Sequence, residues 1–98
     1  MAGIDEIIHQ PVRLRIMSSL VALDAGEQVD FSYLRKLLKV TDGNLGAHLT
    51  KLESVQYVEM EKTFVGKKPK TYIRITGRGR DAFGEHIASL QGIIEGRE

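Results

Sequence analysis

The sequence predicts a small, mainly α-helical domain of the α+β class, with a three-helix core, a β-hairpin and a C-terminal helix. Its 98 residues are 42% hydrophobic and 28% charged, which is typical of one small globular domain. Apolar residues recur at helical spacing up to residue 55, alternate as in strands between residues 58 and 75, and then return to helical spacing. We therefore expect one domain over residues 1–98, with the hairpin at about 58–75 and the last helix at about 77–95.

The first helix is predicted from a single apolar stripe. Pro11 suits the first turn of this helix, because its missing N–H group would have no partner there. Residues 4–9 form an initial arm or a short separate turn, and the polar stretch 24–28 ends the helix. The residues of the stripe lie close to three or four positions apart: Ile7, Ile8, Val12, Ile16, Leu20 and Leu23.

Two short helices follow, separated by a tight turn. Asp30 and Thr41 are candidate N-caps, because a side-chain oxygen at that position accepts a hydrogen bond from a free backbone N–H. The second helix would bury Leu34, Leu37 and Leu38, and the third, which runs to about Val55, would bury Leu45, Leu49 and Leu52.

A hairpin and a last helix complete the chain. Residues 58–65 and 71–75 have the alternation of strands, and the turn between them contains Gly, Pro and Lys. We expect Phe64 to pack under this hairpin and Tyr57 to lie at the rim of the core. Thr76 can cap the last helix.

The last helix carries a narrow apolar stripe, of the kind that packs against one partner helix. A domain of this size has little core to spare for such a stripe, and symmetric dimers are the commonest oligomers. We therefore expect a homodimer. The alternative is that the helix folds back on the first helix of its own chain. The expected dimer interface consists of Ile4, Ile8, Phe83, Ile87, Leu90 and Ile94.

The charge of the chain is unevenly distributed. The total is +1, but residues 61–80 contain seven Lys and Arg against Glu61 alone, a net +6, and the remaining residues carry −5. A local positive field of this kind is expected where a polyanion binds. The alternative is a basic loop that is merely solvated.

A short helix, a tight turn, a second helix and a hairpin with a cationic tip form the order of a winged helix-turn-helix domain. The stretches 31–53, 57–62 and 76–80, with the opening 9–17, resemble small winged-helix transcriptional regulators related to the MarR and ArsR families, over nearly the whole chain. The resemblance implies a dimer that binds duplex operator DNA and is sometimes modulated by a small molecule or ion.

The expected DNA contacts lie on the third helix and on the hairpin, or wing. A helix N-terminus offers free N–H groups and partial positive charge to a phosphate. Asn can pair with adenine, a small residue allows close approach, and Lys neutralises phosphate. Thr41 could serve only as a cap, and Asp42 would repel phosphates unless it accepts from a cytosine. The expected residues are Thr41, Asp42, Asn44, Ala47, His48 and Lys51 on the helix, and Lys67, Lys68 and Lys70 on the wing. Arg13 and Arg15 could approach the DNA backbone from the first helix, or be solvated or paired with carboxylates.

The sequence departs from the pattern of these regulators in two ways. Lys39 and Gln56 stand at corners where glycine is common, and a left-handed conformation costs a non-glycine residue about 1 kcal/mol, so we expect differently shaped corners. Gly46 and Ala47 replace polar or basic side chains, which predicts few base-specific contacts and more reading of DNA shape.

Other functions lack support in the sequence. The chain has no cysteine, and its three histidines lack metal-ligand spacing, so we expect no metal and no cofactor, although His86 and Glu85 could share a metal across a dimer. Residues 77–82 match a dinucleotide fingerprint only weakly, because no parallel strand follows. We expect no enzyme activity. The rival function is a winged-helix protein-interaction module.

The expected location is the cytoplasm. The N-terminal stretch 1–8 contains two carboxylates and no Lys or Arg, and no apolar run is long enough for a membrane span, so we expect neither a signal peptide nor a membrane partner. The operator sequence, the sign of regulation and the identity of an effector do not follow from the sequence.

Overall fold

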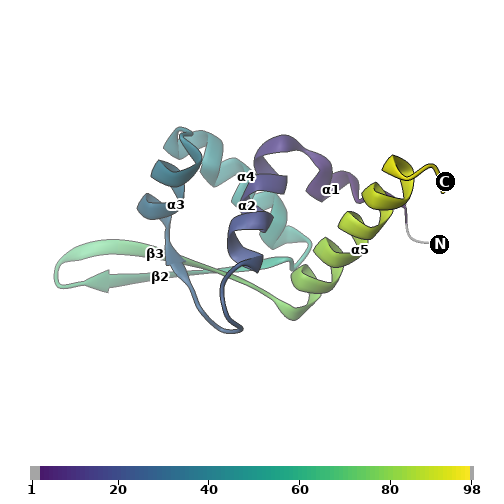
Figure 1. Cartoon of the computed structure of the whole chain (residues 1–98). Helices are drawn as coiled ribbons and strands as arrows, with labels where there is room; N and C mark the ends of the chain where they lie inside the picture. The colour runs from purple at the N-terminus through teal and green to yellow at the C-terminus, as the bar shows by residue number, and fades with distance from the viewer. Residues whose placement is uncertain (1–2, 98) are drawn as a thin grey trace.

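The computed structural model describes residues 3–97, in which helices surround the base of a three-stranded antiparallel sheet (Figure 1). The expected fold class is confirmed, as is the order of the predicted helices and of the hairpin, with α1 as a separate turn before the first long helix; the short strand β1 was not predicted. The helices are α1 (Glu6–His9), α2 (Pro11–Val21), α3 (Phe31–Leu38), α4 (Asp42–Ser54) and α5 (Gly77–Ile94), and the strands are β1 (Val29–Asp30), β2 (Val58–Val65) and β3 (Lys68–Ile75).

Side-chain caps begin the helices where the sequence predicts them. The Asp30 carboxylate accepts from the N–H of Tyr33 at 2.7 Å, and the Thr41 hydroxyl accepts from that of Asn44 at 3.1 Å. Thr76 caps α5 in the same way, through the N–H of Gly79 at 2.9 Å. Each cap satisfies one of the N–H groups that a helix leaves free at its start.

The two corners without glycine have the left-handed geometry after all, so the expectation of different corners is wrong. Lys39 has φ 57° and Gln56 has φ 64°. Backbone hydrogen bonds hold both conformations: the N–H of Val40 donates to Arg35 O at 3.3 Å, and that of Tyr57 donates to Leu52 O at 3.0 Å. These bonds satisfy carbonyls at the ends of α3 and α4, which offsets the local strain.

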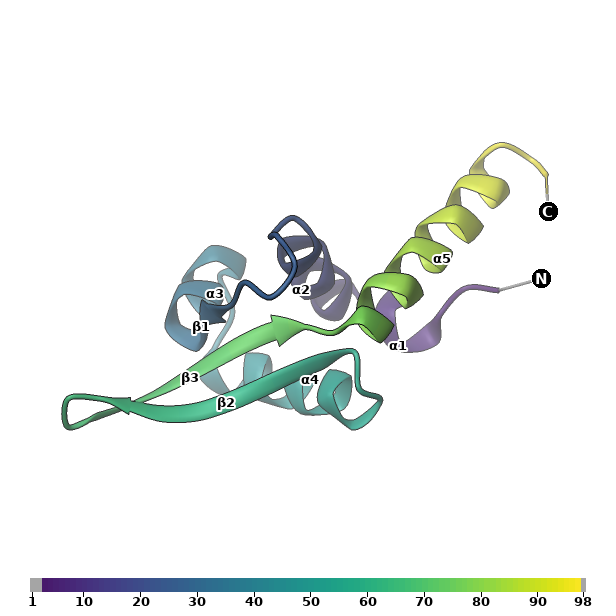
Figure 2. The same ribbon diagram turned by 90° about the horizontal axis from the view of Figure 1, so that it is seen from below.

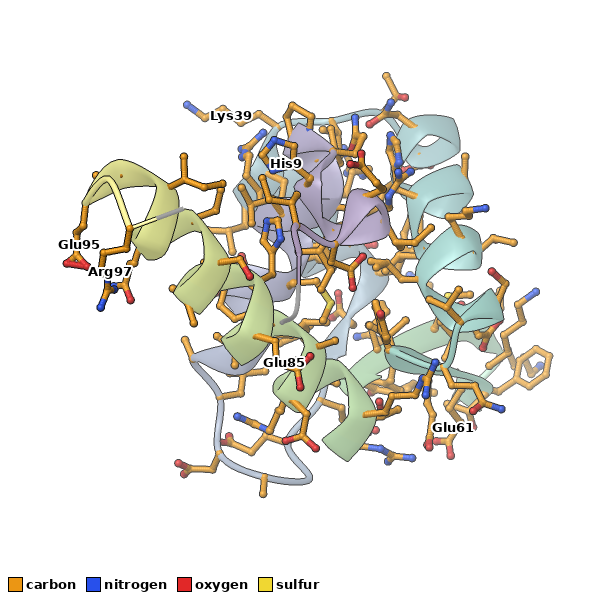
Figure 3. The ribbon with its side chains drawn as sticks, turned by 90° about the vertical axis from the view of Figure 1, so that its right-hand side faces the viewer. His9, Lys39, Glu61, Glu85, Glu95 and Arg97 are labelled. Atoms are coloured by element: carbon orange, nitrogen blue, oxygen red, sulfur yellow. The ribbon has the colours of Figure 1, made fainter. Side chains whose placement is uncertain are left out.

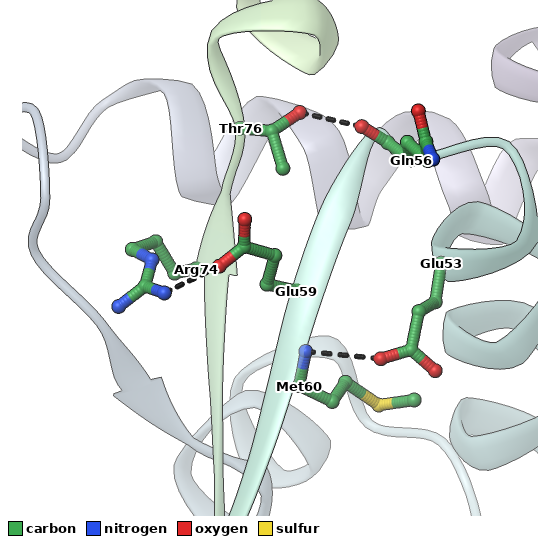
Figure 4. A network of polar contacts seen from close by, with 6 residues as sticks. All are labelled: Glu53, Gln56, Glu59, Met60, Arg74 and Thr76. Atoms are coloured by element: carbon green, nitrogen blue, oxygen red, sulfur yellow. Dashed lines mark hydrogen bonds and ion pairs between the residues drawn. The ribbon is translucent and has the colours of Figure 1, made fainter.

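Side chains and strand contacts fasten the second corner to the sheet (Figure 4). The Thr76 hydroxyl donates to the carbonyl of Gln56 at 2.6 Å, and the N–H of Met60 donates to the Glu53 carboxylate at 3.2 Å. An ion pair between Arg74 and Glu59 joins the two strands beside them. The end of α4 and the start of β2 are therefore fixed relative to each other.

The hairpin extends well beyond the helices (Figure 2), in a molecule measuring 54 × 25 × 21 Å. Strand β3 lies between β1 and β2, and its pairing with β2 runs from Val58 opposite Ile75 to Val65 opposite Lys68. This register puts Phe64 near the tip, where it is 69% exposed. The expectation that Phe64 packs under the hairpin is therefore wrong, because the core ends before it.

The core lies between α2, α3, α4 and the base of the sheet. The apolar faces expected for these helices are confirmed except at Leu37, which is 49% exposed because α3 turns that side outward. Tyr57 packs at the edge of the core, as expected. The buried apolar residues are Ile8, Ile16, Met17, Leu20, Leu34, Leu38, Leu45, Leu49, Leu52, Val58, Ile73 and Ile75.

Helix α5 is held against the N-terminal arm by a polar side that the sequence did not reveal. His86 and Ser89 are buried there, and the Ser89 hydroxyl donates to Gly3 O at 3.2 Å. The expected apolar stripe lies beside this polar side: Phe83, Ile87 and Leu90 are half-buried, and Ile94 is 82% exposed.

Of the two arm residues expected in a dimer interface, Ile4 is half-buried and Ile8 is completely buried. Ile8 is therefore corrected to a core residue, because the chain itself already covers its side chain.

Candidate nucleic-acid interface

The outer face of α4 carries the side chains that the sequence assigns to DNA. Asn44, Ala47 and Lys51 are exposed and His48 is half-buried. The leucines of α4 hold the opposite face in the core, so this helix is anchored along its length while its outer side chains remain accessible. Helices are admitted to the major groove of B-DNA, which is about 12 Å wide.

The start of α4 combines a cap with a neutralised carboxylate. Thr41 acts as the N-cap, which leaves the other free N–H groups of the first turn pointing outward. Asp42, the side chain that would repel phosphate, forms an ion pair with Arg35 of α3 at 2.8 Å. This pairing reduces the negative charge next to the helix N-terminus.

Arg13 and Arg15 on α2 form hydrogen bonds with other parts of the chain. Arg15 Nη2 donates to Leu38 O at 2.8 Å, which ties α2 to the end of α3. Arg13 Nε donates to Ile7 O, and its Nη1 lies 3.1 Å from His48 Nδ1. The pKa of His48 is lowered, first by desolvation and then by the Arg13 charge. Within residues 3–97 neither arginine forms an ion pair with a carboxylate, and Arg15 remains exposed to solvent.

The wing lysines divide into free and paired side chains. Lys67 and Lys68 are exposed at the tip, and within residues 3–97 no ion pair engages either of them. Lys70 lies 3.4 Å from the Asp30 carboxylate. The pKa of Asp30 is lowered mainly by the N–H of Tyr33, with Lys70 also contributing. Lys70 therefore has less charge to offer than its two neighbours.

The arginines of the basic window do not add to the wing tip. Arg74 pairs with Glu59, and Arg78 donates to Val55 O at 2.9 Å. Arg80 donates to Val21 O at 3.1 Å and to Leu23 O at 2.7 Å, which fastens α5 to the end of α2. The net +6 of residues 61–80 therefore overstates the field at the tip, because Glu59 neutralises Arg74, and Arg78 and Arg80 lie on α5, outside the hairpin.

Sequence reasoning missed Lys62 and Phe64 as candidate contacts. Side chains alternate along β2, so these two lie on the same side of the strand as Val58 and Met60, which face the helices. Lys62 and Phe64 continue that side beyond the core, and both are exposed. The signal was the period-two alternation itself, which assigned the pair to the core-facing side without showing where the core ends.

The elements that carry these residues lie together. Figure 2 shows α4 lying along β2, with the wing reaching past the N-terminal end of the helix. Glu85 on α5 and Glu95, which caps the end of that helix, lie at the end of the molecule opposite the wing tip (Figures 1 and 3), and Glu95 forms an ion pair with Arg97 there.

Other kinds of site find little support in the described part of the chain. No group of three His, Asp or Glu side chains within residues 3–97 could hold a metal ion. His86 is buried whereas Glu85 is exposed, so the two do not converge in one copy. Between residues 3 and 97, no helix is long and apolar enough to cross a membrane.

An apolar hollow of about 280 Å³ lies between α2 and α3, beside Tyr33 and Leu37.

Comparison with protein families identifies the same architecture. A family model described as "winged helix DNA-binding domain" matches residues 12–94. An uncharacterized protein from Methanocaldococcus jannaschii is 42% identical over 85 residues, which are 87% of this chain and 89% of the relative.

Solved structures give similar matches. A transcriptional regulator homologue from Pyrococcus horikoshii superposes with a TM-score of 0.83 at 32% identity, over 96% of this chain and 90% of that one. A PadR-like transcription factor from Bacteroides fragilis gives 0.68 at 25% identity, over 93% and 94% of the two chains. These neighbours are described as transcriptional regulators rather than enzymes, and because one is PadR-like, the relationship to the MarR and ArsR families is loose.

Proposed function

This chain belongs to the family of winged helix DNA-binding domains, and from that membership we propose that it regulates transcription by binding duplex operator DNA as a homodimer. One observation carries the proposal: the exposed outer face of α4 lies beside a wing whose tip lysines have no ion-pair partner among residues 3–97. A helix enters the major groove, and a cationic hairpin reaches the neighbouring backbone or minor groove.

The proposed contacts divide by role. Asn44 is the candidate for pairing with adenine, while Lys51, Lys67 and Lys68 neutralise phosphates, with a smaller share from Lys70. The first-turn N–H groups behind Thr41 and Asp42 are suited to a phosphate oxygen. Ala47 permits close approach of the helix to the groove. Gly46 and Ala47 bring no base-reading atoms, so shape and backbone contacts supply much of the affinity.

The proposed dimer uses the stripe on α5. Phe83, Ile87 and Leu90 are half-buried and Ile94 is largely exposed, so a second copy can cover apolar surface that the chain leaves open. Ile4 of the arm lies half-buried and is also proposed for this interface. A two-fold dimer presents two α4 helices to successive turns of DNA.

Three further points extend the proposal. The chain acts as one winged-helix unit, with its wing at about 58–75 and its last helix at about 77–95. A DNA partner favours a cytoplasmic location beside the chromosome. Any small-molecule effector would bind at the dimer seam or between helices, and the apolar hollow beside Tyr33 is one such place.

The test is a selection of bound fragments from genomic DNA, followed by titration of the recovered sequence at several salt concentrations. We expect affinity to fall steeply with salt, and the selected sites to contain paired half-sites about one helical turn apart. A protein that retains no DNA, or whose affinity is indifferent to salt, would contradict the proposal.

A protein-interaction module is the second candidate function. It is favoured by the lack of base-reading side chains at Gly46 and Ala47 on α4 and by the exposed Phe64 and Val65 at the wing tip. Recovery of a stoichiometric protein partner together with failure to retain DNA would establish this function instead.

A further inference from the structure

His48 projects from the outer face of α4, between the two side chains best suited to touch DNA. It follows Asn44 by four residues and precedes Lys51 by three, and such spacings put side chains on one side of a helix. Unlike its two neighbours, His48 is half-buried. Something in the molecule therefore covers part of the ring and restricts how it can turn.

The group that restricts the ring is the Arg13 guanidinium. Arg13 Nη1 lies 3.1 Å from His48 Nδ1, and the same guanidinium donates from Nε to Ile7 O. Two bonds thus fix Arg13 between the N-terminal arm and α4. A guanidinium has N–H donors and no acceptor, and it stays protonated at every physiological pH.

This pairing determines where the imidazole carries its proton. Because Arg13 can only donate, Nδ1 of His48 must accept, and a neutral ring then carries its hydrogen on Nε2. The lowered pKa of His48 supports the neutral form, since desolvation and the Arg13 charge both disfavour protonation. Within residues 3–97 no hydrogen bond engages Nε2 of His48, and this atom is not fully buried.

We propose that His48 is a specificity-determining residue which presents a fixed Nε2–H donor to a purine N7 in the major groove, and that Arg13 is the positioning residue that sets this tautomer. The inference rests on the proposed DNA-binding function. A purine N7 is an acceptor in both guanine and adenine, whereas the cytosine amino group is a donor and would face the N–H unfavourably. Arg13 itself contributes no contact with DNA.

The tautomer is tested on the free protein. Long-range ¹H–¹⁵N NMR spectra at pH 7 should show His48 with Nδ1 unprotonated and Nε2 protonated. In Arg13→Met, the restraint is gone, and we expect a mixture of tautomers and a raised His48 pKa in a chain whose other amide signals keep their dispersion. A wild-type ring protonated on Nδ1, or an unchanged tautomer in Arg13→Met, would overturn the role of Arg13. Arg13→Lys, which keeps a donor, should move the tautomer ratio less than Arg13→Met.

The base contact is tested with the DNA that the wild-type protein selects. At the purine whose preference disappears in His48→Ala, replacement by the 7-deaza purine removes only the N7 acceptor. We expect wild-type affinity to fall about 5- to 100-fold there, with no further loss in His48→Ala. His48→Gln, which retains an N–H donor, should keep part of the sensitivity.

The control is Lys51→Ala, which should weaken binding to all sequences and leave the response to the 7-deaza purine intact. Binding that is salt-sensitive but insensitive to 7-deaza substitution everywhere would overturn the His48 assignment while leaving the proposed function in place. Failure to bind any DNA would overturn both.

Discussion

The backbone N–H of Asp5 donates a hydrogen bond of 3.0 Å to Nδ1 of His86, and this bond fastens the N-terminal arm to α5. The Asp5 carboxylate serves two other elements. One oxygen caps α1, and the other accepts from the Tyr57 hydroxyl at 2.6 Å, at the corner between α4 and β2. That bond and burial together raise the pKa of Tyr57 to about 12, with burial the larger cause. Asp5 therefore joins the proposed dimer helix to the end of the proposed DNA-binding helix.

The chain should lose stability as the pH falls through the ordinary histidine pKa of about 6.5. His86 is fully buried and its pKa is lowered, first by desolvation and then by the nearby His9, against opposing effects of Asp5 and Glu6. The unfolded chain therefore binds this proton at a higher pH than the folded chain does. The contribution of neutral His86 to the free energy of unfolding is therefore present above pH 6.5 and is lost as the pH falls below it.

This dependence is measured by urea unfolding at a series of pH values from 8 to 5. His86→Gln, whose amide oxygen can still accept from Asp5, should show a flatter profile. Some dependence should remain, because the pKa of His48 is also lowered. An identical pH profile in His86→Gln would show that His86 has no part in it.

Two glycines of α5 should respond to alanine in opposite ways. A Cβ on Gly79 would overlap the carbonyl oxygen of Tyr57, which also accepts from the Thr76 N–H. We expect Gly79→Ala to lower the free energy of unfolding by about 2 kcal/mol, the range of overpacked sites. Gly84 has open space around it, so Gly84→Ala should raise that free energy by about 0.5–1 kcal/mol through helix propensity. Chemical denaturation of both variants checks the contrast, which equal effects would contradict.

Glycine should stabilise the two left-handed corners. Lys39→Gly and Gln56→Gly each remove a strain of about 1 kcal/mol, partly offset by the greater entropy of the unfolded chain. We expect a net gain of a few tenths of a kcal/mol or more at each position. Lys36→Gly, inside α3, is the matched control and should cost about 1 kcal/mol. The stability of the three variants is compared from their urea unfolding midpoints. A lower midpoint in both Lys39→Gly and Gln56→Gly would show that the native side chains compensate for the strain.

The sequence was sufficient for the helices and the hairpin, because their signals are local, but it did not predict the two-residue strand β1. Caps such as Asp30 and Thr41 and the stripes of leucines act within one or two turns, and they were confirmed except at Leu37. The corners at Lys39 and Gln56 were predicted wrongly because the preference of non-glycine residues for negative φ was given too much weight. The geometry that joins α3 to α4, and α4 to β2, requires a left-handed residue at each corner. Tertiary context overrides a cost of about 1 kcal/mol.

Many of the polar contacts could not be predicted because one partner is a backbone group, which does not depend on the amino-acid type. Arg13, Arg15 and Arg80 donate to backbone carbonyls, which every residue has, so no sequence pattern pairs them. His86 was one of three scattered histidines, and nothing local marks it as buried. Counting charges therefore located the basic window, but it did not show that the arginines in this window bond to other groups of the chain.

The two free wing lysines should contribute more to DNA binding than the paired one. Lys67→Ala combined with Lys68→Ala should weaken binding to all sequences and reduce the slope of log affinity against log salt by about 2, since each phosphate contact accounts for about 1. Lys70→Ala should change the slope by less, because Asp30 already neutralises that side chain. Fluorescence anisotropy at several salt concentrations measures all three slopes. An equal or larger effect of Lys70→Ala would mean that its ion pair opens on DNA.

A charge on the α5 stripe should dissociate the proposed dimer without unfolding the chain. Ile94 is 82% exposed and lies in the last turn of α5, where a lysine is compatible with the helix dipole. In a symmetric dimer, Ile94→Lys would desolvate a charge in each copy, and we expect association at least tenfold weaker. Ile87→Lys, nearer the middle of the stripe, should have a larger effect. Ala88→Lys, exposed on a different side of α5, is the control and should leave association unchanged. Sedimentation equilibrium gives the masses and circular dichroism checks the fold. A wild-type chain that is monomeric at micromolar concentration, or an Ile87→Lys variant that remains fully dimeric, would remove this stripe as the interface.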